Sequence, residues 1–235
     1  MQEKLTQLVD RLKEAHQDRL VSVILYGSAA GPDHNEKFSD LNVLCVLSGV
    51  TVPDLARSEP IFKWWRDGRN PAPLLMSEEE VRTSTDSFTI EFHDMQERRR
   101  ILFGKDVIDG LAIDRSFYRA QLEHELRAKL LRLRQKAGGL LSDGKALLRL
   151  MLDSVSTFCV LARHSLLLSG ADVGWQKRDV ANKLGELGAD PAPFLMLLDV
   201  REEKRDATTL DPVTVFEAYL KQIEALVAHV DRLQK

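Results

Sequence analysis

The sequence predicts an α+β fold: a mixed β-sheet domain with flanking helices, followed by an all-α helical bundle. Two apolar runs, Val21–Tyr26 and Leu41–Leu47, are each followed by a break, Gly27 in one case and Ser48-Gly49 in the other. Runs that are apolar on both faces are typical of buried strands. From about Ser116 onward no strand pattern remains and helical periodicity continues. We therefore expect two domains, residues 1–112 and residues 113–235.

Further elements of the first half follow from local signals. A helix is expected over residues 3–17, where apolar side chains recur on one helical face. The segment Pro53–Arg66 is predicted as a helix at least from Pro60 onward, since proline suits a first helical turn. Leu74–Met76 is a short strand candidate. The sequence Ser77-Glu78-Glu79-Glu80 is a capping box, which predicts a helix start.

The segment Phe88–Met95 alternates between apolar and more polar residues, which predicts a half-buried strand. On that strand Glu91 lies on the polar face between apolar neighbours. The run Arg98-Arg99-Arg100 is expected to begin another helix or turn, which Gly104 ends.

The second half is predicted to be a helical bundle with short connections. Glycines and Asp-Pro pairs separate five periodic segments. These segments are residues 116–137, 143–169, 176–187, 192–206 and 212–234. Trp175, at the start of the third segment, is either a core residue or part of a cleft.

Composition excludes several classes of protein. The 235 residues are 44% hydrophobic and 29% charged, with a net charge of −3. No run reaches the roughly 18 apolar residues of a membrane span. Neither half is basic enough to indicate nucleic-acid binding. The N-terminal segment carries acids from Glu3 onward, unlike a signal peptide. Cys45 and Cys159 lie in apolar surroundings, which favours buried thiols in a reducing, cytoplasmic compartment.

The turn Gly27-Ser28, directly after a buried strand, is a candidate phosphate-binding element. Glycine lets the backbone approach a ligand and adopt a positive φ. The Ser28 hydroxyl and nearby amides are then able to donate hydrogen bonds to phosphate oxygens. The alternative is an ordinary strand-to-helix turn, because such dipeptides are common at turns.

Three oxygen-bearing side chains are candidate metal ligands. Asp40 and Asn42 are two apart on the expected strand, so they share one face. Carboxylate and amide oxygens hold Mg²⁺. Glu91 would complete the set, because an unpaired carboxylate among apolar neighbours is costly. The alternatives are that Ser39-Asp40 caps a loop, with Asn42 incidental, and that Glu91 forms a salt bridge with Arg98 or Arg99.

Together these residues resemble the DNA polymerase β-like nucleotidyltransferases, in particular the small bacterial members related to kanamycin nucleotidyltransferase and the minimal nucleotidyltransferases. Their pattern is Gly-Ser, a gap of about ten to thirteen residues, Asp-x-Asp, and a third carboxylate on a later strand. Here it reads Gly27-Ser28, Asp40-Leu41-Asn42 and then Glu91. The resemblance covers roughly residues 4–106, and the helical second half is similar by architecture only.

The resemblance implies that Gly27 and Ser28 bind the nucleotide phosphates, and that Asp40, Asn42 and Glu91 are the catalytic metal ligands, holding two Mg²⁺ ions. The expected reaction transfers a nucleoside monophosphate from an NTP, with ATP the expected substrate, to a hydroxyl acceptor. Two departures stand out. Asn42 replaces the second Asp, and the residues after Ser28 lack the Arg or Lys that relatives often carry there.

These departures leave an alternative function open. The chain is either an active enzyme or a catalytically degenerate nucleotidyltransferase-fold protein that binds a nucleotide or a partner, including the partner of a toxin–antitoxin pair. The expected partners are a nucleotide and a small-molecule or protein acceptor, with no nucleic acid and no membrane. A homodimer is left open.

Overall fold

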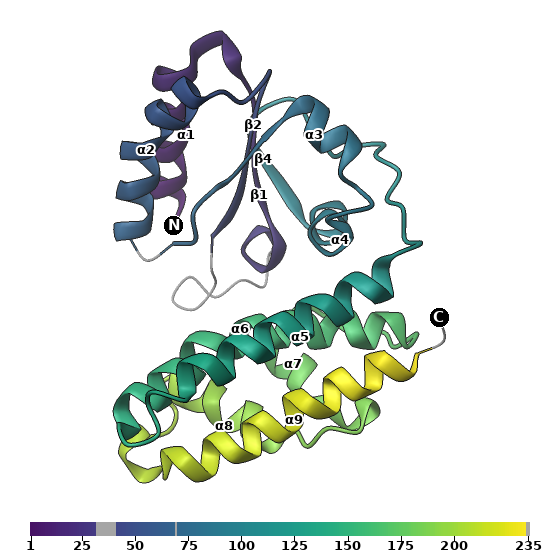
Figure 1. Ribbon diagram of the computed structural model, residues 1–235. Helices are drawn as coiled ribbons and strands as arrows, with labels where there is room; N and C mark the ends of the chain where they lie inside the picture. Colours follow the sequence, from purple (N-terminus) through teal and green to yellow (C-terminus); the bar gives the residue numbers. More distant parts are fainter. Residues whose placement is uncertain (32–40, 69, 234–235) are drawn as a thin grey trace. The chain divides into compact units, whose positions relative to one another are not determined.

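The computed structural model describes residues 1–31, 41–68 and 70–233. Within them the chain forms two compact units, Met1–Phe117 and Tyr118–Lys235 (Figure 1). The first contains the sheet and the second is helical, so the predicted fold class is confirmed. Asp40, one of the three expected metal ligands, lies outside the described residues.

The first unit is built on a mixed four-stranded sheet with the order β3-β2-β1-β4 (Figure 1). Its strands are β1 (Leu20–Tyr26), β2 (Asn42–Leu47), β3 (Leu74–Ser77) and β4 (Arg99–Gly104). Strand β1 pairs antiparallel with both β2 and β4, whereas β2 and β3 are parallel. The flanking helices are α1 (Gln2–His16), α2 (Val52–Asp67), α3 (Glu78–Thr83) and α4 (Thr89–Glu97). Strand β4 is thus an edge strand.

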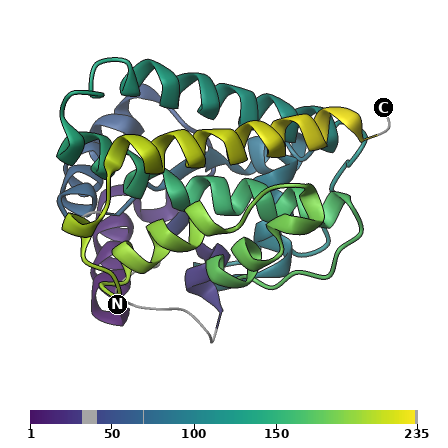
Figure 2. The same ribbon diagram turned by 90° about the horizontal axis from the view of Figure 1, so that it is seen from below.

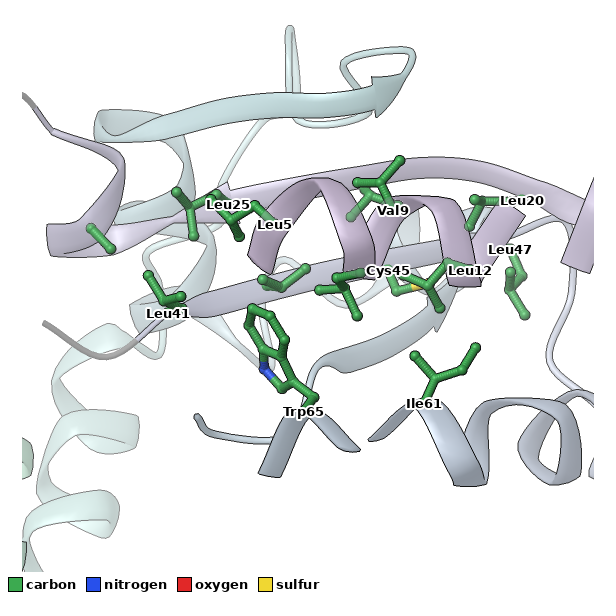
Figure 3. Close-up of a cluster of buried hydrophobic side chains, with 14 residues drawn as sticks. Leu5, Val9, Leu12, Leu20, Leu25, Leu41, Cys45, Leu47, Ile61 and Trp65 are labelled. Carbon is green, nitrogen blue, oxygen red and sulfur yellow. The ribbon is translucent and has the colours of Figure 1, made fainter. Parts of the chain in front are cut away.

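Each face of the sheet has its own apolar core. The face toward α1 and α2 buries Leu25 and Cys45 of the strands against Leu5 and Trp65 of the helices (Figure 3). The side chains on α1 recur every three or four residues, so one helical stripe meets the sheet. The opposite face buries Leu44 and its neighbours against α3 and α4. Both central strands are therefore covered on two sides, which explains why they are apolar without alternation.

Two of the predicted elements in this unit are wrong. Phe88–Met95 is not a strand: α4 spans Thr89–Glu97. Phe88 accepts a helical hydrogen bond from the Phe92 amide at 3.0 Å, directly after a turn at Ser84. An eight-residue run is too short for periodicity alone to separate a strand from a helix. The arginines expected to begin a helix or turn instead lead into β4, which pairs with β1 over residues 99–104.

The predicted helix starts are only partly correct. The capping box at Ser77 is present, since Ser77 Oγ accepts the Glu80 amide at 3.1 Å and Glu80 accepts the Ser77 amide at 2.7 Å. Helix α2 begins at Val52, so Pro53 is the proline of its first turn and Pro60 lies inside it.

The second unit is a helical bundle, as predicted. Its α-helices are α5 (Tyr118–Ala137), α6 (Gly144–Leu168), α7 (Lys177–Asn182), α8 (Ala192–Arg201) and α9 (Pro212–Arg232). Helix α6 is central, because α5, α7, α8 and α9 all pack against it (Figure 2). Among the described residues, none of the helices combines the length and the apolar character needed to cross a bilayer.

Candidate active site at one end of the sheet

The turn that follows β1 is formed by Gly27, whose φ of +76° lies in the left-handed region. L-residues with a side chain rarely adopt this conformation, so glycine is required here. The Gly27 amide donates to the carbonyl oxygen of Arg98 at 3.0 Å, which ties the turn to the entry of β4. Residues Gly27–Ala30 then form one 3₁₀ turn, with Gly27 and Ala29 buried and Ser28 half-buried. Ser28 is therefore the residue of this turn placed to meet a ligand.

Asn42 lies beside this turn. It is the first residue of β2 and pairs with Tyr26, the last residue of β1. Its Nδ2 atom is 3.5 Å from the position that a Cβ on Gly27 would occupy. The structure thus brings the Gly27-Ser28 turn and Asn42 together, as the sequence pattern implies.

Glu91 approaches the same strand end from α4 and not from a strand. It lies in the first turn of the helix, half-buried, and α4 packs against the turn Gly27–Ala30. The pKa of Tyr26, the last residue of β1, shows that Glu91 lies close to this strand end. Burial raises the pKa of the Tyr26 hydroxyl well above its ordinary value, and the charges of Glu91 and Asp94 raise it further. Tyr26 therefore keeps its proton at neutral pH and can donate a hydrogen bond.

Asp94 is a second acidic residue whose charge acts on Tyr26, and the sequence pattern does not single it out. It follows Glu91 by three positions in the same helix, so the two carboxylates share one helical face. The 3.6-residue period would have indicated this pair once the segment was recognised as a helix. Tyr26, hidden within an apolar strand pattern, gives no such signal.

The four strands carry no aspartate or glutamate in the part of the chain that the structure describes. In the parallel pair β2–β3, Leu44 is opposite Leu74, so Ala72 and Pro73 precede the strand on the side of Asn42. The third carboxylate of the expected pattern is thus not supplied by the neighbouring strand. Helix α4 is the described element that brings acidic side chains to this end of the sheet.

Strand β4 brings cations to the same region. Arg99 pairs with Tyr26 in the sheet, and its Nε donates to Asp106 Oδ2 at 2.8 Å. A second contact joins Arg99 to Asp109 at 3.7 Å. These acids, and not Glu91, are the ion-pair partners of Arg99. Arg98, between α4 and β4, contacts the Gly27 turn through its main-chain oxygen.

The second unit holds a separate polar cluster on its central helix. Arg163 and His164 of α6 are buried, and the Tyr118 hydroxyl hydrogen-bonds His164 Nδ1. The Arg163 guanidinium carbon lies 3.8 Å from the ring centroid of Trp175, which is half-buried. This is a cation–π contact. Trp175 is thus part of a polar cluster and not an ordinary core residue.

Comparison with known proteins adds one fold match. No protein-family model and no curated protein matches the sequence. Among solved structures, the spectinomycin adenyltransferase AAD(9) from Enterococcus faecialis, determined with ATP and spectinomycin, is similar to this chain. The TM-score is 0.64 at 14% identity, and the match covers 99% of this chain and 100% of that one. At this identity the likeness establishes the fold alone, and it confirms the fold that the sequence resemblance implies.

Proposed function

We propose that this chain, which has the fold of the small bacterial nucleotidyltransferases, is a Mg²⁺-dependent nucleotidyltransferase. The observation that carries the proposal is the gathering of three different groups where β1 ends. These groups are the left-handed glycine turn with Ser28, the amide of Asn42, and the α4 carboxylates that act on Tyr26. A phosphate cradle next to acidic oxygen ligands is what a metal–triphosphate complex requires.

Each group has a role in the proposal. Gly27 and Ser28 hold the triphosphate through the turn and the serine hydroxyl. Asp40, Asn42 and Glu91 hold magnesium, which when bound neutralises the phosphate charge and aligns the attacking and leaving oxygens. Asn42 supplies a neutral oxygen, so one negative charge is lost relative to an Asp-x-Asp pattern. Asp94, on the same helical face as Glu91, is placed to restore that charge.

The proposed reaction is a displacement at the α-phosphorus of ATP. A new bond forms between the acceptor oxygen and the α-phosphorus, and the bond from that phosphorus to the oxygen bridging to the β-phosphate breaks. Pyrophosphate leaves, and the acceptor proton passes to a base. Tyr26 stays protonated in this scheme, so it positions oxygens as a hydrogen-bond donor and does not serve as that base.

The proposed acceptor is a hydroxyl group of a small molecule. The likeness to an adenyltransferase determined with ATP and spectinomycin supports this class of acceptor and ATP as the nucleotide. A protein hydroxyl is the alternative, and self-labelling is its simplest form.

The test is incubation of the full chain with Mg²⁺ and α-labelled ATP across a panel of hydroxylated small molecules. We expect label transfer that Glu91→Gln reduces by about a hundredfold, the order of loss for a group that acts in the transition state. Glu79→Gln is the control, because Glu79 is exposed on α3 and its side chain pairs only with Arg82 in the described hydrogen bonds and ion pairs. No transfer to any acceptor and no self-labelling, from a chain that binds ATP, would contradict the enzymatic proposal.

A second candidate is nucleotide binding without transfer. It is favoured by the neutral Asn42 and by the lack of an acidic residue on the described strands. In that case the chain binds ATP with little dependence on Mg²⁺, and its output is a change in binding to a partner, such as the second protein of a toxin–antitoxin pair. Calorimetric titration with ATP, with and without Mg²⁺, separates the two candidates.

A further inference from the structure

A cleft between α1 and the edge strand β4 holds a charge that the proposed reaction does not use. The cleft has a volume of about 210 Å³, is open to solvent, and lies within the first unit. Its walls include Gln2, Thr6 and Val9 of α1 and Arg100 and Leu102 of β4. Arg100 is the one charged residue among those that line it. The cleft therefore has a positive charge and no acidic residue in its walls.

Arg100 points away from the face of the sheet that carries Glu91. Its neighbour Arg99 donates to the main-chain oxygens of Met95 and Gln96 in α4, so Arg99 lies on the α4 face. Successive strand residues point to opposite faces. Arg100 accordingly lies on the α1 face, where it lines the cleft.

The guanidinium of Arg100 is incompletely satisfied. Its Nε and Nη2 atoms have almost no exposed surface and no hydrogen-bond partner in the described part of the chain. An arginine keeps its charge at every physiological pH. Buried donors without acceptors are costly, and in a folded protein such a group usually marks a water or an ion. In Arg99, one residue earlier, Nε donates to Asp106 and Nη1 donates to the Met95 and Gln96 carbonyls, so the unsatisfied donors belong to Arg100 and not to its neighbour.

The size of the cleft limits what it can hold. Its volume of about 210 Å³ lies below the range of pockets for drug-sized ligands, which begins at about 300 Å³. A single phosphate, a pyrophosphate or a small carboxylate is of a size that matches it.

We propose that this cleft is a binding site for a small oxyanion, with Arg100 as its anchor. Because Nε and Nη2 are buried, the Arg100 side chain has to change its rotamer to present them to the cleft, where the oxygens of the anion would accept their hydrogen bonds. Carboxylates and phosphates present paired oxygens that match a guanidinium fork. The Gln2 side-chain amide supplies a neutral hydrogen-bond donor, and the Thr6 hydroxyl, which donates to the Gln2 carbonyl at 3.2 Å, supplies an acceptor for a protonated oxygen.

The test is thermal unfolding of the full chain in phosphate, pyrophosphate or acetate, each compared with chloride at equal ionic strength. We expect the midpoint of the wild-type chain to rise by about 5 °C at a hundred times the dissociation constant of the effective ion. Arg100→Met should abolish the rise and be at least as stable as wild type in chloride, because it removes unsatisfied donors. A response to phosphate and pyrophosphate alone identifies a phosphoryl ligand, and a response to acetate as well identifies a general oxyanion site.

Two controls separate this site from the Gly27 turn and from surface charge. Ser28→Ala should keep the anion response, and so should Arg82→Met, which removes an exposed arginine of α3. Should Arg100→Met fail to fold, phosphate titration of isotope-labelled wild-type protein gives the same answer, through shifts of the Thr6 and Arg100 amide signals, whether or not the Gly27 signal shifts as well. The proposal is wrong if no ion raises the wild-type midpoint, if Arg100→Met responds like wild type, or if the amide shifts occur only at Gly27.

Discussion

The two ends of the central strand pair use carboxylates in opposite ways. Where β1 begins and β2 finishes, Asp54 is fully buried and surrounded by donors. Arg19 Nη2 donates to its Oδ2 at 2.8 Å, Thr51 Oγ1 donates to the same oxygen at 2.6 Å, and Arg57 reaches Oδ1 at 3.2 Å. Where β1 ends and β2 begins, acidic side chains of α4 gather near a glycine turn and an amide, beside the protonated Tyr26.

The two ends differ in whether their carboxylates are neutralised by neighbouring donors. Hydrogen bonds from Thr51 and Arg19 hold the pKa of Asp54 well below its usual range, so this carboxylate is saturated inside the protein. The same network fixes the N-terminus of α2, because Asp54 also accepts the Thr51 amide at 3.0 Å. At the opposite end, burial and the charges of Glu91 and Asp94 raise the pKa of Tyr26. Negative charge is thus gathered next to a tyrosine there, whereas at Asp54 it is neutralised by arginine.

The largest expected effect is the loss of stability on Asp54→Asn. The amide has one acceptor oxygen and an NH₂ group. With the NH₂ group in place of Oδ2, the hydrogen bonds from Arg19 Nη2 and Thr51 Oγ1 are lost together. We expect this variant to lower the urea midpoint of the first unit more than any other substitution considered, with Trp64 and Trp65 of α2 as fluorescent probes. Asp67→Asn, an exposed position in the same helix, should be neutral. Equal stability of the two variants would show that the Asp54 network is not structural.

The second effect concerns magnesium at the opposite end. Asn42→Asp adds a negative charge beside the turn, and a unit charge about 4 Å from an ion is worth up to about 4 kcal/mol at an effective dielectric near 20. After desolvation we expect Mg²⁺ affinity in the presence of ATP to rise by about tenfold or more, measured by calorimetry. Asn70→Asp, in the loop between α2 and β3, is the comparison. An unchanged Mg²⁺ affinity would mean that the missing charge at position 42 does not limit the metal site.

The sequence predicts the fold wherever local chemistry and burial agree. Val21–Tyr26 is apolar on both faces because helices cover both sides of β1. The capping box at Ser77 starts α3 as expected. The segment Phe88–Met95 fails because its alternation fits a strand, while Phe88, Phe92 and Met95 also fit one face of a helix. The segment is helical in the structure, where the Phe88 amide donates to Ser84 of the preceding turn and the Phe92 amide donates to Phe88.

From the sequence, only those residues of the candidate site that lie close together in the chain could be predicted. The Gly27-Ser28 turn and Asn42 belong to one strand pair, so the sequence places them together. Arg98 reaches the turn because β4 returns to pair with β1 across more than seventy residues of chain, which no local pattern encodes. Arg100 and its cleft depend in addition on which face of β4 meets α1.

A smaller effect tests the turn itself. Gly27→Ala should cost about 1 kcal/mol, since φ is +76° and an added methyl would meet only Asn42 Nδ2 at an ordinary 3.5 Å. Gly110→Ala is the matched control, because Gly110 also has a positive φ, of 71°, but open space around it. Both variants should lose similar stability in urea, and only Gly27→Ala should weaken ATP binding. Equal ATP affinity in the two variants would show that the Gly27 turn does not take part in ATP binding.

The smallest expected effect is a change in pH dependence at the saturated end. His16 is buried, with Nε2 3.0 Å from Ser58 Oγ and Nδ1 3.9 Å from Asp54 Oδ1. Burial lowers its pKa below the ordinary 6.5, an effect that the Asp54 charge partly offsets and that Arg57 and Arg19 reinforce. The unfolded chain therefore binds the proton more readily, so this contribution to stability is complete above pH 6.5 and declines as the pH falls below it.

His16→Gln should flatten this decline. Urea midpoints of the first unit at pH 7.5, 6.5 and 5.5, followed in a Trp175→Phe background so that only α2 tryptophans report, should fall less steeply than in the parent chain. The difference stays below about 1.4 kcal/mol per pH unit, the limit for a single proton. His124→Gln, at an exposed position in α5, should leave the pH profile unchanged. Parallel profiles for His16→Gln and its parent would show that protonation of His16 does not weaken the Asp54 network, and that this end of the sheet is insensitive to charge added beside it.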